Sequence, residues 1–295
     1  MKLINFFLFI IISSFIYCSD YSTVLIKNGT LDISKLNLKT SKVIKLDGTW
    51  EFYGSAFISY DKFHEFEYKP LFKSVPDYWH NNRESNYGYA TYRLKLSGLV
   101  PFKAYEIFVL PMEDSYTLYF NSEKIVSAGR IGKDSKSCTP LFKSSHSIFV
   151  PKTDRGELIL HVSGFHGRRT GPTGSILFSE YPSITSNREA KIIEFFFITG
   201  AVFFIGLYYL FFYLFRKIEK SALYFSIFCI LIAVRSAIVS LDYSFFREIA
   251  SYEILNKVEY LMFTFTAMFF IFFINAVFHS LINMKFFKPL IYISS

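Results

Sequence analysis

The chain has 295 residues, a formal net charge of +8 and an aromatic content of 20%. Its lysines are scattered and interleaved with acidic residues, so the positive charge does not indicate a nucleic-acid partner. Its three cysteines lie in three different parts of the chain, at positions 18, 138 and 229, and do not suggest a disulfide framework.

The first 18 residues are predicted to be a secretory signal peptide. Lys2 precedes an apolar stretch from Leu3 to Tyr17 that is short for a bilayer span, and small or polar residues follow it. Cleavage is expected near Cys18. Lipidation of Cys18 is disfavoured because the bulky Tyr17 stands where a lipobox has a small residue. An uncleaved signal anchor is a further alternative, and it would leave the following domain on the same side.

Residues 19–188 are predicted to form one extracytoplasmic β domain. The runs ATYRLKL, AYEIFVL and ELILHV each alternate with a period of two, which is typical of half-buried strands. The residues expected on one face of these strands are Tyr92, Leu94, Leu96, Tyr105, Ile107, Val109, Leu158, Leu160 and Val162. Turn-forming clusters of Gly, Asn, Asp and Pro separate the runs. Eight or more short strands without a helical stretch predict a β-sandwich, with a jelly roll as the favoured version.

Two segments of this domain are candidates for ligand binding. The loop HGRRTGPTG joins two predicted strands and contains His166, Arg168 and Arg169. Adjacent arginines on a glycine-rich loop can grip a carboxylate or phosphate through paired N–H donors, although a solvated loop or a helix interface is also open. Trp79 lies in a Pro-containing turn, where it can stack on a sugar or pack in the core. For Trp50 we favour core packing.

The sequence does not predict an active site or a metal centre. The only acids worth considering as a glycosidase pair are Asp77, Glu84, Glu113 and Asp114. Their spacing does not impose the separation of about 5–10 Å that such a pair requires. The six histidines show no ligand spacing with cysteines or acids. We therefore expect no enzymatic activity, no metal and no other cofactor.

The region from residue 189 to 295 is predicted to be a helical transmembrane bundle. Its full spans are residues 195–215, 221–240 and 260–278, which are long enough to cross a bilayer and lack a polar face. The basic RKIEK hinge after the first span is expected inside, which places the β domain outside. A fourth apolar run begins near residue 286 and stops early, so we expect a fragment or an early-terminated product.

One charged residue lies within the second predicted span. Arg235 is about five residues from the outer end of the span, where a charge is costly unless it is paired. Glu259 begins the third span near the same level. We favour an intramembrane Arg235–Glu259 ion pair, either as a clamp or as a coupling between helices, over snorkelling of Arg235 to the headgroups.

Several motifs of the β domain follow one another in a familiar order. They are LDGTWEFY at 46–53, VPDYW at 75–79, GYATYR at 88–93 and HVSGF at 161–165. This series resembles jelly-roll domains with a galactose-binding-like fold, including the sugar-binding domains of family-2 glycoside hydrolases. Tyr89, within the third motif, is counted with Trp79 among the candidate ligand-binding residues. Ser122 departs from the pattern, because it stands where the "NG" hairpin has a glycine.

The membrane region adds a second set of motifs. They are Thr199-Gly200, KSALYF at 220–225, Arg235 and KVEYL at 257–261. Together with the β domain they resemble bacterial seven-transmembrane receptors with diverse intracellular signalling modules. The resemblance implies an extracytoplasmic jelly roll that precedes seven helices and a cytoplasmic effector. The departure is large, because three of the seven spans and no effector are present.

The expected function is therefore that of a sensor in the bacterial inner membrane. Its β domain would bind an extracytoplasmic small molecule or glycan, and its helices, embedded in the lipid bilayer, would carry the signal inward. A membrane-anchored carbohydrate-binding or adhesion protein without signalling output is the alternative. A homodimer is left open.

Overall fold

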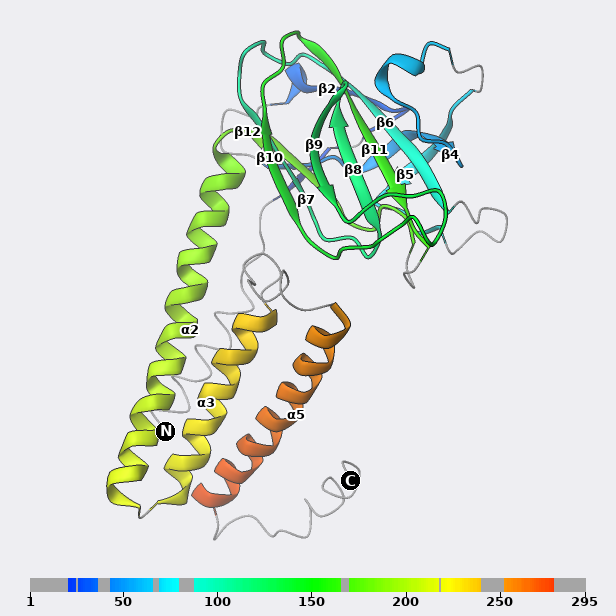
Figure 1. Cartoon of the computed structure of the whole chain (residues 1–295). Coiled ribbons are helices and arrows are strands. Elements are labelled where there is room, and N and C mark those ends of the chain that lie inside the picture. Colours follow the sequence, from blue (N-terminus) through cyan, green and yellow to red (C-terminus); the bar gives the residue numbers. More distant parts are fainter. Residues whose placement is uncertain are drawn as a thin grey trace. The chain divides into compact units, whose positions relative to one another are not determined.

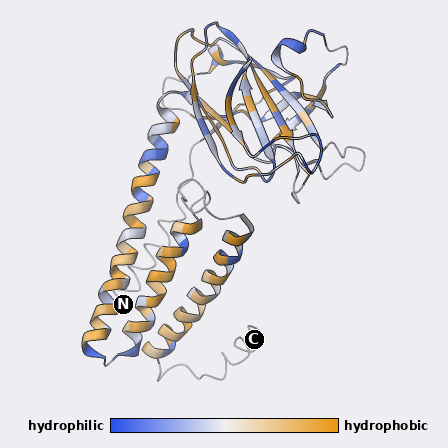
Figure 2. Ribbon diagram, in the orientation of Figure 1, coloured by the Kyte–Doolittle hydropathy of each residue, from blue (hydrophilic) through white to orange (hydrophobic). Residues whose placement is uncertain are grey.

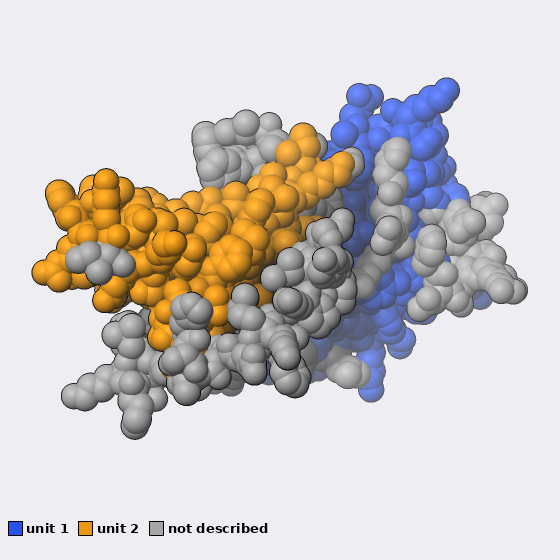
Figure 3. All heavy atoms as spheres, turned by 90° about the horizontal axis from the view of Figure 1, so that it is seen from below, with its two compact units in different colours: residues 1–187 blue, residues 188–295 orange. Residues whose placement is uncertain are grey.

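The computed structural model describes residues 21–24, 26–36, 43–65, 69–79, 88–165, 170–217, 219–239 and 252–278. The predicted signal peptide and the apolar run beginning near residue 286 lie outside these residues. The chain divides into two compact units, Met1–Asn187 and Arg188–Ser295 (Figure 3). Strands make up the first unit, and long helices make up the second (Figure 1).

The first unit contains two sheets. The order in the five-stranded sheet is β1 (Ser22–Thr23), β3 (Ile44–Lys45), β12 (Ile176–Glu180), β7 (Tyr105–Val109) and β10 (Ser145–Phe149). The order in the seven-stranded sheet is β5 (Leu71–Val75), β4 (Gly48–Gly54), β6 (Tyr89–Ser97), β11 (Arg155–Ser163), β8 (Ser115–Phe120) and β9 (Glu123–Ala128), with β2 (Thr30–Asp32) also paired to β6. Two short 3-10 turns, η1 (Ile33–Lys35) and η2 (Tyr60–Lys62), interrupt the connections.

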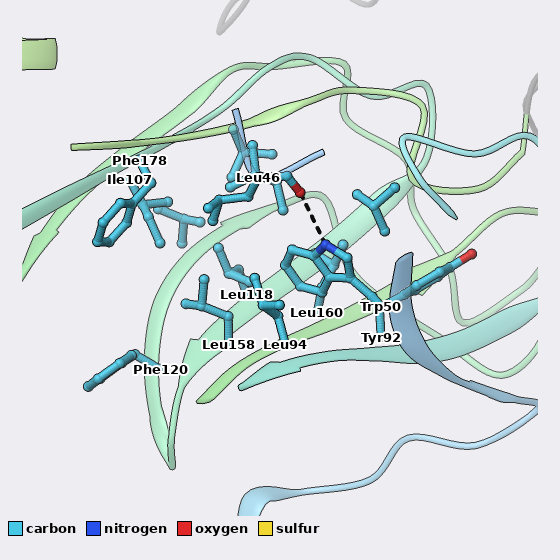
Figure 4. Packing of buried hydrophobic residues seen from close by; sticks show 14 of the residues in the cluster. Leu46, Trp50, Tyr92, Leu94, Ile107, Leu118, Phe120, Leu158, Leu160 and Phe178 are labelled. Atoms are coloured by element: carbon cyan, nitrogen blue, oxygen red, sulfur yellow. Dashed lines mark hydrogen bonds between the residues drawn. The ribbon is translucent and has the colours of Figure 1, made fainter. Parts of the chain in front are cut away.

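The core lies between these two sheets. Trp50 and Leu94 from the seven-stranded sheet pack in one cluster with Ile107 and Phe178 from the five-stranded sheet (Figure 4). The indole Nε1 of Trp50 donates a hydrogen bond to the Leu46 carbonyl at 3.1 Å. Because of this bond, the polar Nε1 atom of the fully buried tryptophan has a hydrogen-bond partner inside the core. The unit is thus a β-sandwich, and the core role predicted for Trp50 is confirmed.

The alternation read from the sequence identifies the inner faces of the strands. The nine residues expected on one face of β6, β7 and β11 are all buried, and all belong to the common core. The prediction of half-buried strands implies that the opposite faces are exposed to solvent, and the structure differs from it there. Arg93 on β6 and Glu106 on β7 are buried as well, because other segments of the chain cover the outer faces at these points.

The second unit contains most of three long apolar helices, which Figure 2 shows as largely hydrophobic ribbons. They are α2 (Ser183–Arg216), α3 (Lys220–Val239) and α5 (Tyr252–Val277). Among the described residues these three helices are long and apolar enough to cross a membrane. α2 begins well before the predicted span at residue 195, because its first turns carry charged helix-forming residues that a hydropathy pattern leaves out.

Helix α3 contacts both of the other helices. Its Phe225 ring lies 4.9 Å from the Tyr209 ring of α2 and 5.0 Å from the Phe273 ring of α5. Phe228 makes a further aromatic contact with Phe270 of α5 at 5.2 Å. Packing between apolar helices in a bilayer depends on such close contacts, because lipid tails compete equally for apolar surface.

Candidate functional site

The residues that flank the HGRR sequence lie beside Trp79 and Gly88. The Trp79 N–H donates to the Thr170 carbonyl at 2.8 Å, and the Gly164 N–H donates to the Gly88 carbonyl at 2.8 Å. These bonds join the flanks of the HGRR sequence to the flanks of residues 80–87. His166, Arg168 and Arg169 themselves lie outside the described residues, so their role stays a prediction.

Trp79 and Tyr89 are described, and neither side chain stands free on the surface. The Trp79 side chain is only 3% exposed, and its Nε1 donates to the Tyr92 hydroxyl at 2.8 Å. A ring buried in this way presents no face for stacking, so the geometry favours the core-packing alternative for Trp79. The Tyr89 ring is half-buried and lies 4.9 Å from the Phe57 ring.

A buried carboxylate supports the loop that follows the HGRR sequence. Asp114 Oδ2 accepts a hydrogen bond from the Gly171 N–H at 2.6 Å. The φ of Gly171 is +111°, a conformation that side-chain-bearing residues rarely adopt. Asp114 was among the acids considered for glycosidase chemistry, and here it acts as a structural acceptor.

The first turn of α2 is attached to the sandwich through Glu106, whose side chain is completely buried. Its Oε1 accepts hydrogen bonds from the Ile184 N–H and, at 3.0 Å, from the Ser179 hydroxyl. Its Oε2 accepts from the Thr185 N–H at 3.1 Å and from the Thr185 hydroxyl at 2.7 Å. These residues all belong to the first unit, so the junction lies within the sandwich unit itself.

The environment of Glu106 stabilises its negative charge. Burial alone would raise the pKa of this carboxyl, but the hydrogen bonds from His146, Thr185 and Ile184 outweigh that effect and lower the pKa. The positive end of the helix dipole acts in the same direction. His146 Nε2 lies 3.3 Å from Oε2 of Glu106 and supplies a fifth contact. Glu106 is therefore a charged anchor for the start of the helix.

The sequence did not reveal this junction. Alternation places Glu106 on the face of β7 away from the core, as a surface acid would be placed. Its partners come from β10, β12 and the start of α2, and no motif connects these segments. The only local signal is Thr185, a hydroxyl residue near the beginning of a helix.

A second buried charge network lies on the outer face of the seven-stranded sheet. Arg93 on β6 makes two hydrogen bonds to Glu157 on β11, and its Nη1 lies 3.4 Å from Oε2 of Glu51. Lys95 pairs with Glu51 at 2.7 Å. Two cations and two carboxylates balance one another here, which explains how charged residues are tolerated under a covering segment.

The two residues predicted to pair within the membrane are brought together. Arg235 Nη2 on α3 lies 3.2 Å from Glu259 Oε1 on α5, and the two side chains are 34% and 32% exposed. The Arg235 guanidinium also lies over the Phe263 ring, at 5.5 Å from its centroid. The contact can tie α3 to α5, and its role in signalling stays a prediction.

The described residues hold no group of three or more His, Cys, Asp or Glu side chains that could hold a metal ion. Cys138 and Cys229 are both buried and unbridged. Burial raises the pKa of the Cys138 thiol, which lies outside the apolar helices, and so keeps it in the unreactive protonated form.

Comparisons with known proteins give only distant structural similarity. No family model and no curated protein sequence matches the chain. The GH2 β-galacturonidase of Eisenbergiella tayi bound to galacturonate is similar over 47% of this chain and 24% of that enzyme, with 12% identity and a TM-score of 0.35. A β-glucuronidase from an uncultured Clostridium sp. is similar over 47% of this chain and 29% of that enzyme, with 13% identity and a TM-score of 0.34.

The β-glucuronidase of Faecalibacterium prausnitzii is similar over 48% of this chain and 31% of that enzyme, with 12% identity and a TM-score of 0.32. The chain thus spans less than a third of the length of these enzymes, and similarity at this level transfers no activity. The described part of the chain contains a β-sheet-rich domain followed by three helices apolar enough to span a membrane.

Proposed function

We propose that this protein is a membrane receptor of the bacterial inner membrane. Its β-sandwich, of jelly-roll type, binds an extracytoplasmic ligand, and its transmembrane helices carry the resulting change inward. Carbohydrates are the first ligand class to test. The chain has no catalytic role in this proposal, and the effector that receives the signal lies outside these 295 residues.

The observation that supports this proposal is the buried Glu106 junction. A helix that is apolar enough to cross a membrane has its first turn joined to Glu106 of the sandwich by three hydrogen bonds, and Ser179 and His146 of the sandwich hold the same carboxylate. A flexible tether would isolate the two units mechanically, whereas this junction makes the start of the helix respond to the sandwich. Signalling further requires that the ligand bind two conformations with different affinity.

The alternative is a membrane-anchored carbohydrate-binding or adhesion protein. Such a protein needs the same apolar helices, but its helices need not change when the ligand binds. The two functions therefore differ in one observable property, the response of the first turn of α2 to the ligand.

Ligand binding is tested with the full chain in lipid nanodiscs against a panel of neutral and acidic sugars. Charge-assisted contacts contribute about 1.5–3 kcal/mol each, so Arg168→Ala and Arg169→Ala should each weaken binding of an acidic sugar by about tenfold or more. Arg155→Ala is the matched control, because Arg155 begins β11 whereas the HGRR loop follows its other end at Ser163. If Arg168→Ala and Arg169→Ala bind the sugar as tightly as Arg155→Ala does, neither arginine belongs to the binding site.

Coupling is then tested with any sugar that binds. Hydrogen exchange at the Ile184 and Thr185 amides should change when the sugar saturates the wild-type chain. In Glu106→Gln the sugar should still bind, but the exchange at these amides should respond less. A bound sugar that leaves α2 unchanged in the wild type supports the anchored-binding alternative. Hydrolysis of aryl glycosides by the purified chain would contradict the absence of a catalytic role.

A further inference from the structure

A segment without regular strands covers part of the outer face of the seven-stranded sheet. We name residues 55–65, which include η2, the cover segment. Its Ile58 and Phe63 side chains are buried against Tyr53 of β4 and Ile159 of β11, in a cluster separate from the main core. The Phe63 ring also lies over the Arg93 guanidinium, at 4.1 Å from its centroid. The cover segment thus shields the charge network on this face.

Two side chains of the sheet fasten the centre of the cover segment. The Thr91 hydroxyl on β6 accepts from the Ile58 N–H at 3.1 Å and donates to the Ala56 carbonyl at 2.8 Å. His161 Nε2 on β11 lies 3.0 Å from the Ile58 carbonyl oxygen. A carbonyl oxygen only accepts, so Nε2 of His161 carries the proton of this hydrogen bond.

The surroundings of His161 favour the neutral imidazole. Its side chain is only 7% exposed, and its ring lies between Phe57 at 5.0 Å and Tyr119 at 5.1 Å. Its partners across the strands are Thr91 and Thr117, which are uncharged. Burial lowers the pKa of His161, and the hydrogen bond to Ile58 opposes this only in part.

Among the residues that the structure describes, the charged and titratable groups on the surrounding elements do not supply a counter-ion. Arg93, the nearest charged residue along β6, is a cation and is already paired with Glu157 and Glu51. The other charged or titratable residues on these elements are Glu51, Tyr53, Tyr60, Asp61, Lys62, His64, Glu65, Tyr89, Tyr92, Lys95, Tyr116, Tyr119, Arg155 and Glu157; Tyr92 and Tyr116 lie in the main core, and Arg155 is an exposed cation. Those of the cover segment from Asp61 to Glu65 are exposed, so a charge on His161 would be buried without compensation.

We propose that the cover segment opens away from this face of the sheet when His161 takes up a proton. Protonation of His161 adds a charge at a buried position among aromatic rings, and opening hydrates that charge. The cover segment contains one 3-10 turn and few backbone hydrogen bonds, so it opens locally at a lower cost than the sandwich as a whole. Opening exposes the Arg93 face beneath Phe63.

This response is independent of the ligand-binding proposal. It makes the extracytoplasmic unit sensitive to mildly acidic conditions in the range where histidine titrates. If the opened segment restores an ordinary histidine pKa of 6.5 and the closed form takes up no proton, linkage gives an opening equilibrium about tenfold larger at pH 5.5 than at pH 7.5.

The test is hydrogen exchange of residues 55–65 in the full chain in nanodiscs, corrected for the intrinsic effect of pH on amide exchange. Protection of the Ile58 amide should fall by up to about tenfold from pH 7.5 to pH 5.5, while amides of β8 and β11 change less. His161→Gln, which retains an amide donor but cannot be charged, should lose this dependence. His64→Gln, which changes an exposed histidine of the same segment, should retain it.

Two outcomes would overturn the proposal. One is a cover segment whose protection in the wild type does not depend on pH. The other is a His161→Gln variant with the wild-type dependence. If His161→Gln does not fold, the wild-type histidine signals decide by NMR titration. A His161 that takes up its proton at about pH 6.5 while the cover segment stays protected contradicts the coupling.

Discussion

Glu106 supplies hydrogen-bond acceptors for the backbone N–H groups at the start of α2. The first four N–H groups of a helix have no partner within the helix, and here two of them point into a folded domain instead of into water. Glu106 accepts from the Ile184 and Thr185 amides and is held in turn by Ser179 and His146. A neutral residue of the same shape would satisfy fewer donors, because only a carboxylate offers two accepting oxygens.

Replacing Glu106 by glutamine should therefore destabilise the sandwich. The amide removes one acceptor and the charge, so the expected loss is about 1.5–3 kcal/mol in the free energy of unfolding. Urea unfolding followed by tryptophan fluorescence reports on this unit alone, since Trp50 and Trp79 are the two tryptophans of the chain. Glu123→Gln, at an exposed position on β9, is the control and should have little effect.

The same variant should change the response to acid. The pKa of Glu106 is lowered in the folded state, so its contribution to stability is fully present above the ordinary value of 4.5. That contribution is lost as the pH falls through the lower folded value. Glu106→Gln should therefore lose less stability than the wild type below about pH 4.5. An identical acid limb in both proteins would show that folding does not lower the pKa of Glu106.

Helix α3 shows how the apolar helices are held together. Small buried residues line one side of it, namely Ala222, Ser226, Cys229 and Ala233. Small side chains allow helix backbones to approach closely, which is the main source of packing energy between apolar helices. Gly206 of α2 lies at such an approach, because a Cβ added there would stand 2.8 Å from Cγ1 of Ile230 and 3.2 Å from the Cys229 Cβ.

Two glycines of α2 provide a matched test of this contact. Gly206→Ala should destabilise the helix bundle relative to Gly200→Ala by about 1–3 kcal/mol, the usual cost of overpacking. Both variants gain the same helix propensity, but nothing lies within 4 Å of the Cβ position at Gly200. SDS-induced unfolding followed by far-UV circular dichroism measures the difference. Equal stability of the two variants would show that α2 and α3 are not closely packed at Gly206.

The Arg235–Glu259 contact between α3 and α5 should contribute to the stability of the helix bundle. Removing either partner leaves a charge in an apolar environment, whereas removing both does not. The double variant Arg235→Leu, Glu259→Gln should therefore cost less than the sum of the single variants, with a coupling of about 0.5–3 kcal/mol. A thermal-stability assay in nanodiscs measures this cycle, and additive effects would support snorkelling of Arg235 instead.

The molecule combines two units that are stable for different reasons. The sandwich buries one continuous core between its sheets, with both tryptophans fully enclosed. The described helices are long and apolar enough to cross a membrane, and they expose large apolar side chains that suit a lipid environment. The sandwich needs no such environment, because its outer faces carry charges, hydroxyls and short covering segments.

Residues 20–188 expressed alone should therefore form a soluble monomeric domain. We expect a far-UV circular dichroism spectrum dominated by β structure, because the described residues of this part form mainly strands, with α-helix from Ser183 onward. Cooperative urea unfolding with a blue-shifted tryptophan emission should accompany it, since Trp50 and Trp79 are both buried. A helix-dominated spectrum or obligatory detergent would contradict the sandwich.

Local patterns in the sequence were sufficient for the strand faces of β6 and β11 and for the three apolar helices. Alternation and hydropathy are patterns among neighbouring residues. They show which face of a strand or helix is apolar and which face is polar. They also sufficed for the Arg235–Glu259 contact, because helix geometry sets the depth of each residue. The start of α2 at Ser183 was not predicted, because its first turns are polar and precede the predicted apolar span.

Only the tertiary structure decided the roles of Glu106, His161 and Trp79. Thr185 reaches Glu106 across 79 residues, and Ile58 meets His161 across 103 residues. Whether a polar side chain on the outer face of a strand is solvated or buried depends on which distant segment covers it. The sequence by itself determined which residues can be buried, and long-range packing determined which polar groups were enclosed with partners.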